Sequence, residues 1–179
     1  MSTRPGETPL RSEGPKYVLD ATPLIHLAKV GLLEVVLDSF EVYAAESVVA
    51  EVTQGEGHPD AKVIQGAVEN GLLKVHKPLN GEFVRALLRH SEMHAGEAET
   101  LASAVDIGAT AVMDDVVARA VARVYGIRTQ PGTLYMLFRL VAAGKMDATS
   151  AERKLDDMVK CGLYLDSRTL VAAKEKLRE

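Results

Sequence analysis

Short apolar runs alternate along the chain with stretches in which apolar side chains recur every three or four residues. The runs predict strands over residues 16–20, 41–44, 72–76, 109–113 and 127–129. The periodic stretches predict helices over residues 23–30, 32–36, 48–52, 60–70, 83–89, 96–107 and 116–125. Strands that alternate with helices of ordinary length are usually parallel and covered on both faces. We therefore predict an α/β fold of three layers, with a central parallel sheet of four to five strands.

Turn and cap residues set several of these boundaries. Thr22 followed by Pro23 is typical of an N-cap and the first helical position, so a helix is expected to begin there. Ser47 is predicted to cap the helix that follows it in the same way. Residues 55–59 contain two glycines and a proline in a short polar stretch, and this composition predicts a loop.

The two ends of the chain differ from its middle. Prolines and glycines interrupt any regular pattern in residues 1–15, which we predict to be a flexible N-terminal arm. Residues 16–132 carry the alternating pattern and form the predicted α/β core. Over residues 133–179 the pattern is helical only, and we expect a helical extension of the same domain. Its predicted helices span residues 133–142, 148–160 and 167–177.

The composition indicates one folded domain without a general attraction to nucleic acid. Hydrophobic residues make up 47% of the 179 residues and charged residues 26%, as in a globular chain rather than a disordered one. The formal net charge is −4, so a polyanion must be held locally rather than by the field of the whole protein. Aromatic residues make up only 4%, so stacking surfaces for single-stranded nucleic acid are not obvious.

Cysteine usage and the N-terminal pattern bear on the compartment. Cys161 is the single cysteine, which excludes an intramolecular disulfide and a cysteine-based zinc cluster and suits a reducing cytoplasm. No signal peptide or membrane span is readable, because Asp20, His26 and Lys29 interrupt the apolar stretch that follows the arm. We therefore expect a cytoplasmic protein with no membrane partner.

Carboxylates stand where two of the predicted strands end. Asp20 closes the first strand, and Asp114 and Asp115 close the strand over residues 109–113. In a parallel sheet, ligands bind beyond the carboxyl ends of the strands. If these two strands are neighbours, their acids converge on one crevice.

Two further acids, Glu51 and Glu97, lie near predicted helix starts in apolar surroundings. Either could simply complement the helix dipole, and Glu99 lies beside the same apolar stripe as Glu97, so helix geometry does not choose between them. Several carboxylates in one cleft raise one another's pKa unless a cation neutralises them. Mg²⁺ or Mn²⁺ suits such a site, because it prefers carboxylate and water oxygens and leaves positions open for phosphate.

Four short segments carry these acids in order along the chain. They are VLDATPLIHLA at 18–28, VVAEV at 48–52, GEAE at 96–99 and ATAVMDDVVAR at 109–119. Together they resemble the PIN-domain family of metal-dependent ribonucleases, over roughly residues 17–130. In particular they resemble the branch that includes VapC-like toxins of toxin–antitoxin pairs and related prokaryotic proteins with a helical C-terminal extension.

The resemblance implies a Mg²⁺- or Mn²⁺-dependent endoribonuclease that hydrolyses RNA phosphodiester bonds. The catalytic acids that it implies are Asp20, Glu51, Glu97 and Asp115. The metal ligands would come from Asp20, Glu97, Asp115 and Asp114. Asp114 stays an alternative to Asp115, because either member of this pair could turn inward.

Three more residues are candidates for binding the substrate. By the resemblance, the Thr22 hydroxyl accompanies Asp20, while Arg119 and Arg123 lie one turn apart on the helix after the acid pair and could contact RNA phosphates. The simpler interpretations are a helix cap for Thr22 and ordinary solvated charges for the two arginines. The resemblance also implies a homodimer and, for the toxin branch, a small antitoxin protein as a partner.

Two other functions stay open at this stage. In a phosphatase of the haloacid-dehalogenase kind, Asp20 would be the nucleophile and a later acid pair would hold Mg²⁺. That chemistry needs a second Asp where Thr22 stands, and it leaves Glu51 and Glu97 without a role. The other alternative is a non-catalytic PIN-like module that binds RNA or protein, in which the acids are present but the catalytic geometry is lost.

Overall fold

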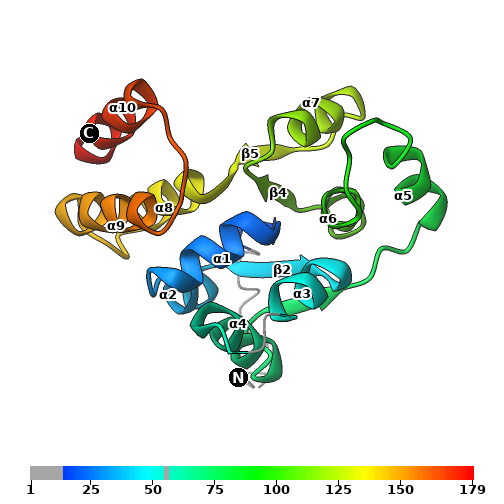
Figure 1. Ribbon diagram of the computed structural model, residues 1–179, viewed down its shortest axis with the longest axis horizontal. Coiled ribbons are helices and arrows are strands. Elements are labelled where there is room, and N and C mark those ends of the chain that lie inside the picture. The colour runs from blue at the N-terminus through cyan, green and yellow to red at the C-terminus, as the bar shows by residue number, and fades with distance from the viewer. Residues whose placement is uncertain (1–13, 55–56) are drawn as a thin grey trace, which may run out of the picture.

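A parallel sheet forms the centre of the computed structural model, which describes residues 14–54 and 57–179 (Figure 1). The sheet of the described residues is five-stranded, in the order β3-β2-β1-β4-β5, and every neighbouring pair is parallel. The strands are β1 (Lys16–Leu19), β2 (Glu41–Ala45), β3 (Lys74–His76), β4 (Thr110–Met113) and β5 (Thr129–Pro131). The predicted α/β fold is confirmed. Most of the predicted arm over residues 1–15 and part of the predicted loop over 55–59 lie outside the described residues.

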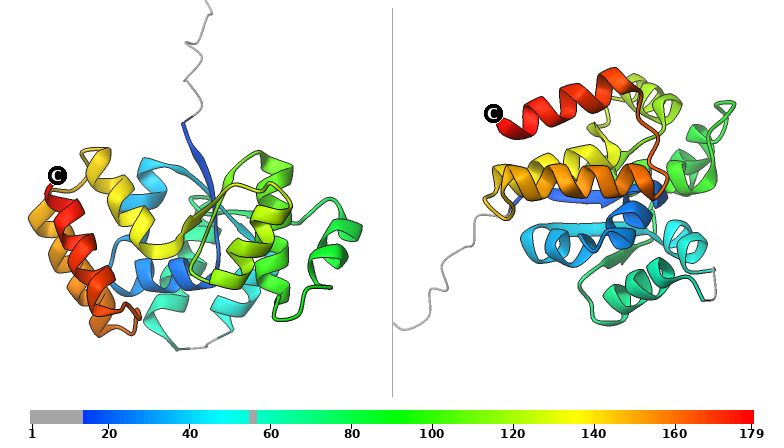
Figure 2. Two further views of the ribbon diagram at one scale, coloured as in Figure 1. Left: turned by 90° about the horizontal axis from the view of Figure 1, so that it is seen from above. Right: turned by 60° about the vertical axis from the view of Figure 1, so that its left-hand side comes forward.

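Helices cover both faces of the sheet, which gives the three predicted layers (Figures 1 and 2). The first are α1 (Ala21–Lys29), α2 (Leu33–Ser39), α3 (Glu46–Thr53), α4 (Pro59–Glu69) and α5 (Gly81–Leu87). They are followed by α6 (Ala95–Ile107), α7 (Val116–Val124), α8 (Gly132–Ala142), α9 (Ala148–Lys160) and α10 (Ser167–Arg178). In the part of the chain that the structure describes, no helix is long and apolar enough to span a bilayer.

Alternation along the strands divides the core into two clusters. Tyr17 and Leu19 of β1 lie with Val112 of β4 in one cluster, and Val18 and Met113 lie in the other. Residues of α1, α2, α3, α4 and the three C-terminal helices contribute to the first cluster, and residues of α5, α6 and α7 contribute to the second. Both clusters are mainly aliphatic, as expected for a chain with few aromatic residues.

The C-terminal helices are part of the first cluster. Leu137 of α8, Leu155 of α9 and Leu177 of α10 are buried together with Leu24 of α1. Figure 2 shows these three helices, coloured yellow to red, side by side at one end of the molecule. Their apolar faces are therefore covered by the same core that supports the sheet.

Both predicted helix caps are wrong. The N-cap position of α1 is occupied by Asp20, so Thr22 lies inside the first turn. The N-cap position of α3 is occupied by Ala45, so Ser47 lies inside the first turn of that helix. Asp20 and Ala45 have extended backbone geometry, with ψ of 174° and 150°, which an N-cap requires. Each helix therefore starts directly from the strand, and no separate capping residue is needed.

The last strand lies two residues later than predicted. The Ile127 amide donates to the Ala122 carbonyl oxygen at 2.9 Å, so this residue still closes the end of α7. Pairing with β4 begins at Thr129, opposite Ala111. The apolar side chain of Ile127 packs against the second core cluster, which explains why its position in the sequence looked like part of a strand.

Candidate acidic site at the carboxyl edge of the sheet

The two central strands β1 and β4 are neighbours, so the acids that follow them lie at one edge of the sheet. The Asp20 amide donates to the Val112 carbonyl oxygen at 3.0 Å, next to the pair formed by Leu19 and Val112. Side chains alternate along a strand, and the same alternation continues into the residues that follow. Asp20 accordingly contacts α6, whereas Asp114 contacts α8, on the other face of the sheet.

Asp20 is a buried carboxylate that faces other acids. Its exposed fraction is 7%. Burial, together with the negative charges of Glu97 and Glu51, raises the pKa of Asp20 to about 6, against the lowering effect of hydrogen bonds from the Ala21 backbone and Thr100. The Thr100 hydroxyl donates to Asp20 Oδ1 at 3.4 Å. Buried charges are usually paired with an opposite charge, so this arrangement is unfavourable for the protein alone.

Glu97 and Glu51 approach Asp20 from two different helices. Glu97 lies in the first turn of α6 with an exposed fraction of 9%, and its Oε2 accepts a hydrogen bond from the His94 amide at 2.9 Å. Glu51 is exposed on α3. A Cβ atom at Gly96 would lie 3.2 Å from Val48 Cγ2 and 3.6 Å from Glu51 Oε2. The absence of a side chain at Gly96 therefore allows α3 to approach the start of α6 and brings Glu51 to the site.

Glu99 has a different partner from Glu97. Its Oε2 accepts a hydrogen bond from the Ser47 amide at 3.3 Å. This amide lies in the first turn of α3, where backbone donors have no partner within the helix. The two acids of the GEAE segment thus have different roles. Glu97 acts on Asp20, and Glu99 stabilises the beginning of α3.

Asp114 is held at the beginning of α8. Its Oδ2 accepts hydrogen bonds from the Thr133 amide at 3.3 Å and from the Thr133 hydroxyl at 2.9 Å. A Cβ atom at Gly132 would lie 1.8 to 2.2 Å from the carboxyl atoms of Asp114. Only a glycine leaves room for Asp114 in this position, so the start of α8 is built around its carboxylate.

The Asp115 side chain caps α7, the helix that follows it. It occupies the N-cap position of α7, and its Oδ1 accepts a hydrogen bond from the Ala118 amide at 2.7 Å. Its side chain is exposed, whereas Asp114 is half-buried. The structure thus brings Asp20, Glu51 and Glu97 together, and it binds each member of the acid pair to the start of a helix beside them.

Two of the three predicted substrate-binding residues lie at the carboxyl edge, and the third does not. Arg119 Nη1 donates to the carbonyl oxygens of Met113 at 2.9 Å and Asp114 at 2.7 Å, which anchors the guanidinium at the end of β4. Arg123 lies one turn later on α7 and is exposed. Thr22 and Arg119 line the same cavity. Of the two arginines, Arg119 is therefore the one placed at the carboxyl edge.

Asp20 and Glu97 are the groups best placed to hold a hard cation. Over residues 14–54 and 57–179, no group of three or more His, Cys, Asp and Glu side chains is arranged to hold a metal. Mg²⁺, however, is commonly bound by one or two carboxylates, while water and substrate phosphates complete its shell. Two buried carboxylates with Glu51 at their rim fit this mode of binding. A zinc site with four protein ligands does not fit.

Two cavities lie near the carboxyl edge. The larger has a volume of about 400 Å³, and Thr22, Asp114 and Arg119 contribute to its walls together with the connection between α9 and α10. The other has a volume of about 290 Å³ and lies between α1, α3 and α4, with Glu51 in its lining. The first cavity thus reaches Asp114 and the second reaches Glu51, whereas Asp20 lines neither of them.

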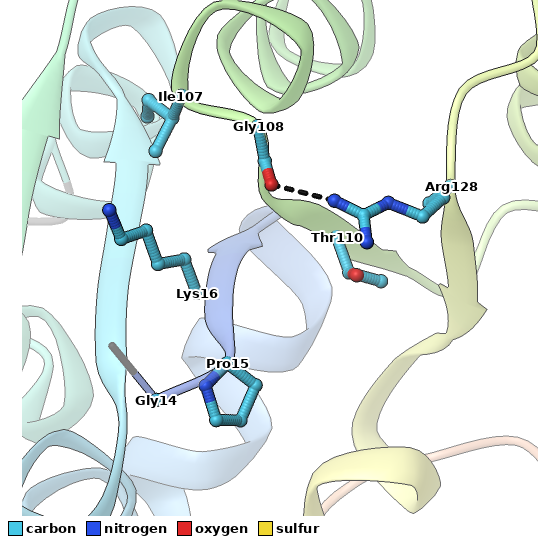
Figure 3. A pocket seen from close by; sticks show the side chains of 7 residues that line it. All are labelled: Gly14, Pro15, Lys16, Ile107, Gly108, Thr110 and Arg128. Atoms are coloured by element: carbon cyan, nitrogen blue, oxygen red, sulfur yellow. Dashed lines mark hydrogen bonds between the residues drawn. The ribbon is translucent and has the colours of Figure 1, made fainter. Parts of the chain in front are cut away.

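A further cavity, of about 280 Å³, lies at the opposite edge of the sheet (Figure 3). Its walls include Lys16 and Thr110, which begin β1 and β4. Arg128 Nη2 donates to the Gly108 carbonyl oxygen at 2.7 Å across this cavity. The cavity contains none of the predicted site residues, so it is separate from the acidic site.

Thr100 and Thr133 hold two of the acids, and neither was among the residues predicted from the sequence. Thr100 follows Glu97 by three positions on α6, and this spacing places both on one face of the helix, so a signal was present. Thr133 lies 19 positions from Asp114, and their contact depends on how α8 packs on the sheet. No local pattern in the sequence predicts it.

No curated protein matches the chain. A solved structure, a domain of a functionally unknown protein from Methanocaldococcus jannaschii DSM 2661, matches with a TM-score of 0.42 and 18% identity, over 65% of this chain and 90% of that chain. A family model described as DUF3368, PIN domain, matches residues 16–179, which include the C-terminal helices. The chain therefore belongs to the PIN-domain family.

Proposed function

We propose that the protein is a metal-dependent ribonuclease that hydrolyses RNA phosphodiester bonds at the edge of the sheet where Asp20 lies. The observation that carries this proposal is the burial of the Asp20 carboxylate beside the charges of Glu97 and Glu51. A divalent cation would compensate these charges, and Mg²⁺ and Mn²⁺ are the ions that carboxylate oxygens select. Membership in a family that often has nuclease activity supports the same function.

In this proposal, Asp20 and Glu97 hold Mg²⁺ or Mn²⁺, and Glu51 lies at the rim. Bound there, the ion would supply an activated water and neutralise charge on the phosphodiester. The rest of the site fixes the two carboxylates. The His94 amide holds Glu97, and the Thr100 hydroxyl holds Asp20, so both donor groups are oriented before a ligand arrives.

Asp115 is the fourth acid of the proposed site, and Asp114 is its alternative. Both follow β4 at the same edge of the sheet as Asp20. Asp115 is exposed and uses only Oδ1 to accept from the Ala118 amide, whereas Asp114 is half-buried and accepts from both the amide and the hydroxyl of Thr133. These contacts favour Asp115 as the acid that is available to the reaction.

The contacts of Asp20 favour a nuclease over the phosphatase alternative. That alternative gave no role to Glu51 and Glu97, yet these are the two acids whose charges act on Asp20. The third residue near Asp20 is Thr100, and it belongs to α6 together with Glu97. A site built from α3 and α6 around the end of β1 uses the acids that the PIN-domain resemblance selects.

Calorimetric titration with Mn²⁺ tests the metal site directly. We expect wild-type protein to bind Mn²⁺, and Asp20→Asn and Glu97→Gln to lose this binding, because each substitution removes one of the two buried carboxylates. Glu99→Gln is the matched control, since it makes the same change on the same helix and keeps an oxygen that can accept from the Ser47 amide. Circular dichroism of each variant checks that the fold is retained.

Cleavage of labelled RNA by the same proteins tests the reaction. We expect wild type and Glu99→Gln to cleave in Mn²⁺ or Mg²⁺, and neither EDTA-treated wild type nor Asp20→Asn to cleave. Cleavage by Asp20→Asn at the wild-type rate would sink the assignment. Metal binding that is lost in the variants, with no cleavage of any RNA by wild type, would instead support the non-catalytic module.

The toxin role, the small antitoxin and the homodimer rest on the resemblance to VapC-like proteins. They extend the proposal to partners and are tested separately from catalysis. Light scattering on the purified full chain is expected to give the mass of a dimer. Expression of wild type in a bacterial host is expected to slow growth, and expression of Asp20→Asn is expected not to.

A further inference from the structure

The cavity of about 400 Å³ lies between the sheet and the C-terminal helices. Its volume falls within the range of sites for small molecules, and it lies beyond the carboxyl ends of parallel strands, where ligands bind in such sheets. The residues that matter for its chemistry are Thr22, His26, Asp114, Arg119, Leu134 and Tyr164. Thr22 and His26 belong to α1, the helix whose N-cap is Asp20. Asp114 also lines the cavity, whereas Asp20, Glu51 and Glu97 do not.

The polar wall of this cavity has defined hydrogen-bonding groups. His26 Nδ1 lies 2.9 Å from the Thr22 carbonyl oxygen. A carbonyl oxygen only accepts, so Nδ1 carries the proton, and Nε2 of the neutral ring is an acceptor. The Thr22 hydroxyl can donate or accept. Arg119, anchored at the end of β4 by two carbonyl oxygens, adds a positive charge in a fixed position.

The connection between α9 and α10 places an aromatic ring at this cavity. Leu163 is 6% exposed and anchors the connection in the first core cluster, whereas Tyr164 next to it is 89% exposed. A tyrosine that packs in no core and lines a cavity with both apolar and polar walls is suited to stack on a planar ligand. Although the chain has few aromatic residues, the Tyr164 ring therefore offers one surface for stacking at this cavity.

We infer that this cavity binds one nucleotide of a single-stranded RNA, with the base on Tyr164 and hydrogen bonds at His26 and Thr22. The inference rests on the proposed function, because the cavity lies at the carboxyl edge of the sheet with Asp114, the alternative fourth acid, in its wall. Exposed bases of single-stranded RNA are recognised by stacking on aromatic rings and by hydrogen bonds to their edges. A nucleotide site in this cavity gives the C-terminal helices a role in binding the substrate.

The charges and the apolar groups of the cavity select this class of ligand. Arg119 and Asp114 contribute one charge of each sign, so the cavity is not built for an isolated phosphate. A purely apolar ligand would leave the Thr22 hydroxyl and His26 Nε2 without partners, which is costly. A nucleotide combines a planar base, hydroxyl groups and one phosphate, and it satisfies the ring, the polar atoms and the guanidinium together.

Titration of ¹⁵N-labelled full-length protein with AMP and UMP tests the inference without any cleavage step. We expect amide shifts at His26 and Tyr164 and in the rest of the α9–α10 connection. Tyr164→Ala is expected to weaken binding about tenfold, the usual order of effect for the loss of one stacked base, while Tyr164→Phe binds as wild type. Val171→Ala on α10 is the control, because Val171 is 56% exposed and outside the cavity lining.

The outcomes separate this inference from the proposed function. Shifts confined to another surface, or equal affinities for Tyr164→Ala and Val171→Ala, would overturn the nucleotide site even if RNA is cleaved. Shifts at the cavity with no metal binding by wild type would support the nucleotide site and contradict the nuclease. With an active enzyme, Tyr164→Ala is expected to raise KM for a short single-stranded RNA about tenfold with little change in kcat.

Discussion

Asp20 ends the central strand with its carboxylate buried against α6, and its charged neighbours there are Glu97 and Glu51. A chain selected only for stability would place an apolar or neutral residue at this position. The Thr100 hydroxyl compensates part of the burial, but it adds no positive charge. A strongly perturbed carboxylate at the carboxyl edge of a parallel sheet is therefore a marker of function.

The raised pKa of Asp20 predicts how stability depends on pH in the metal-free protein. Its pKa rises from 3.8 to about 6 mainly because of burial. The folded state thus holds this proton more tightly than the unfolded state, so the contribution of Asp20 to stability is present below about pH 4 and is lost as pH rises through about 6. The loss amounts to about 3 kcal/mol, from 1.36 kcal/mol for each pKa unit.

Urea unfolding of wild type and Asp20→Asn in EDTA at pH 4 and pH 7 measures this effect. Asp20→Asn removes the titrating group, so its stability relative to wild type is expected to be greater at pH 7 than at pH 4. Saturating Mn²⁺ is expected to stabilise wild type at pH 7 and to leave Asp20→Asn unchanged. Parallel pH profiles for the two proteins would show that the carboxylate is not buried against other acids.

The turn between β4 and α7 serves two helices at once. Asp114 holds the start of α8 through Thr133, and Asp115 caps α7 through the Ala118 amide. Capping residues satisfy backbone donors that have no partner inside the helix, and Asp and Asn do this equally well. The two adjacent acids at this strand end thus stabilise two helix starts, apart from any metal chemistry.

Substitutions of Asp115 separate its capping role from its proposed catalytic role. Asp115→Ala is expected to destabilise the protein by about 1 kcal/mol, because it removes the cap of α7. Asp115→Asn keeps the capping oxygen and is expected to unfold like wild type in urea. Its RNA cleavage is nevertheless expected to fall sharply if the charge of Asp115 takes part in the reaction. Full cleavage by Asp115→Asn would leave this residue with its structural role alone.

The whole molecule is held together by a core that includes its last helix. Leu177 of α10 is 3% exposed and lies in the first cluster with residues of α1, α8 and α9. Arg178 also donates to both carboxylate oxygens of Glu152 at 2.6 and 2.8 Å, at the surface between α9 and α10. Burial rather than this exposed ion pair is expected to dominate, because exposed pairs contribute little in water.

Thermal unfolding of two variants tests whether burial of Leu177 contributes more to stability than the ion pair of Arg178 with Glu152. Leu177→Ala is expected to cost about 2–5 kcal/mol, the usual range when a buried leucine is truncated, and to lower the melting temperature of the entire domain in one transition. Glu152→Gln is expected to melt close to wild type. A separate low-temperature transition in Leu177→Ala would mean that α10 unfolds independently of the sheet.

Most of the fold could be predicted from the sequence, because strands and helices are encoded by local periodicity. The parallel sheet and its layers agree with the expectations. That β1 and β4 are neighbours was only a condition for the convergence of their acids, and the structure meets it. The errors lie at boundaries. Thr22 and Ser47 look like caps, but the preceding strand ends already have the geometry of an N-cap. Ile127 looks like a strand residue, but its amide closes α7.

The sequence by itself determined the order of the elements, the family and the set of acids, since these depend on residue type and on spacing along the chain. Only the tertiary structure decided the partners of each acid. Glu97 acts on Asp20 while Glu99 holds the Ser47 amide, and Asp114 binds Thr133 from another helix. These contacts join segments far apart in sequence, and they depend on how helices pack across the sheet, which no local pattern encodes.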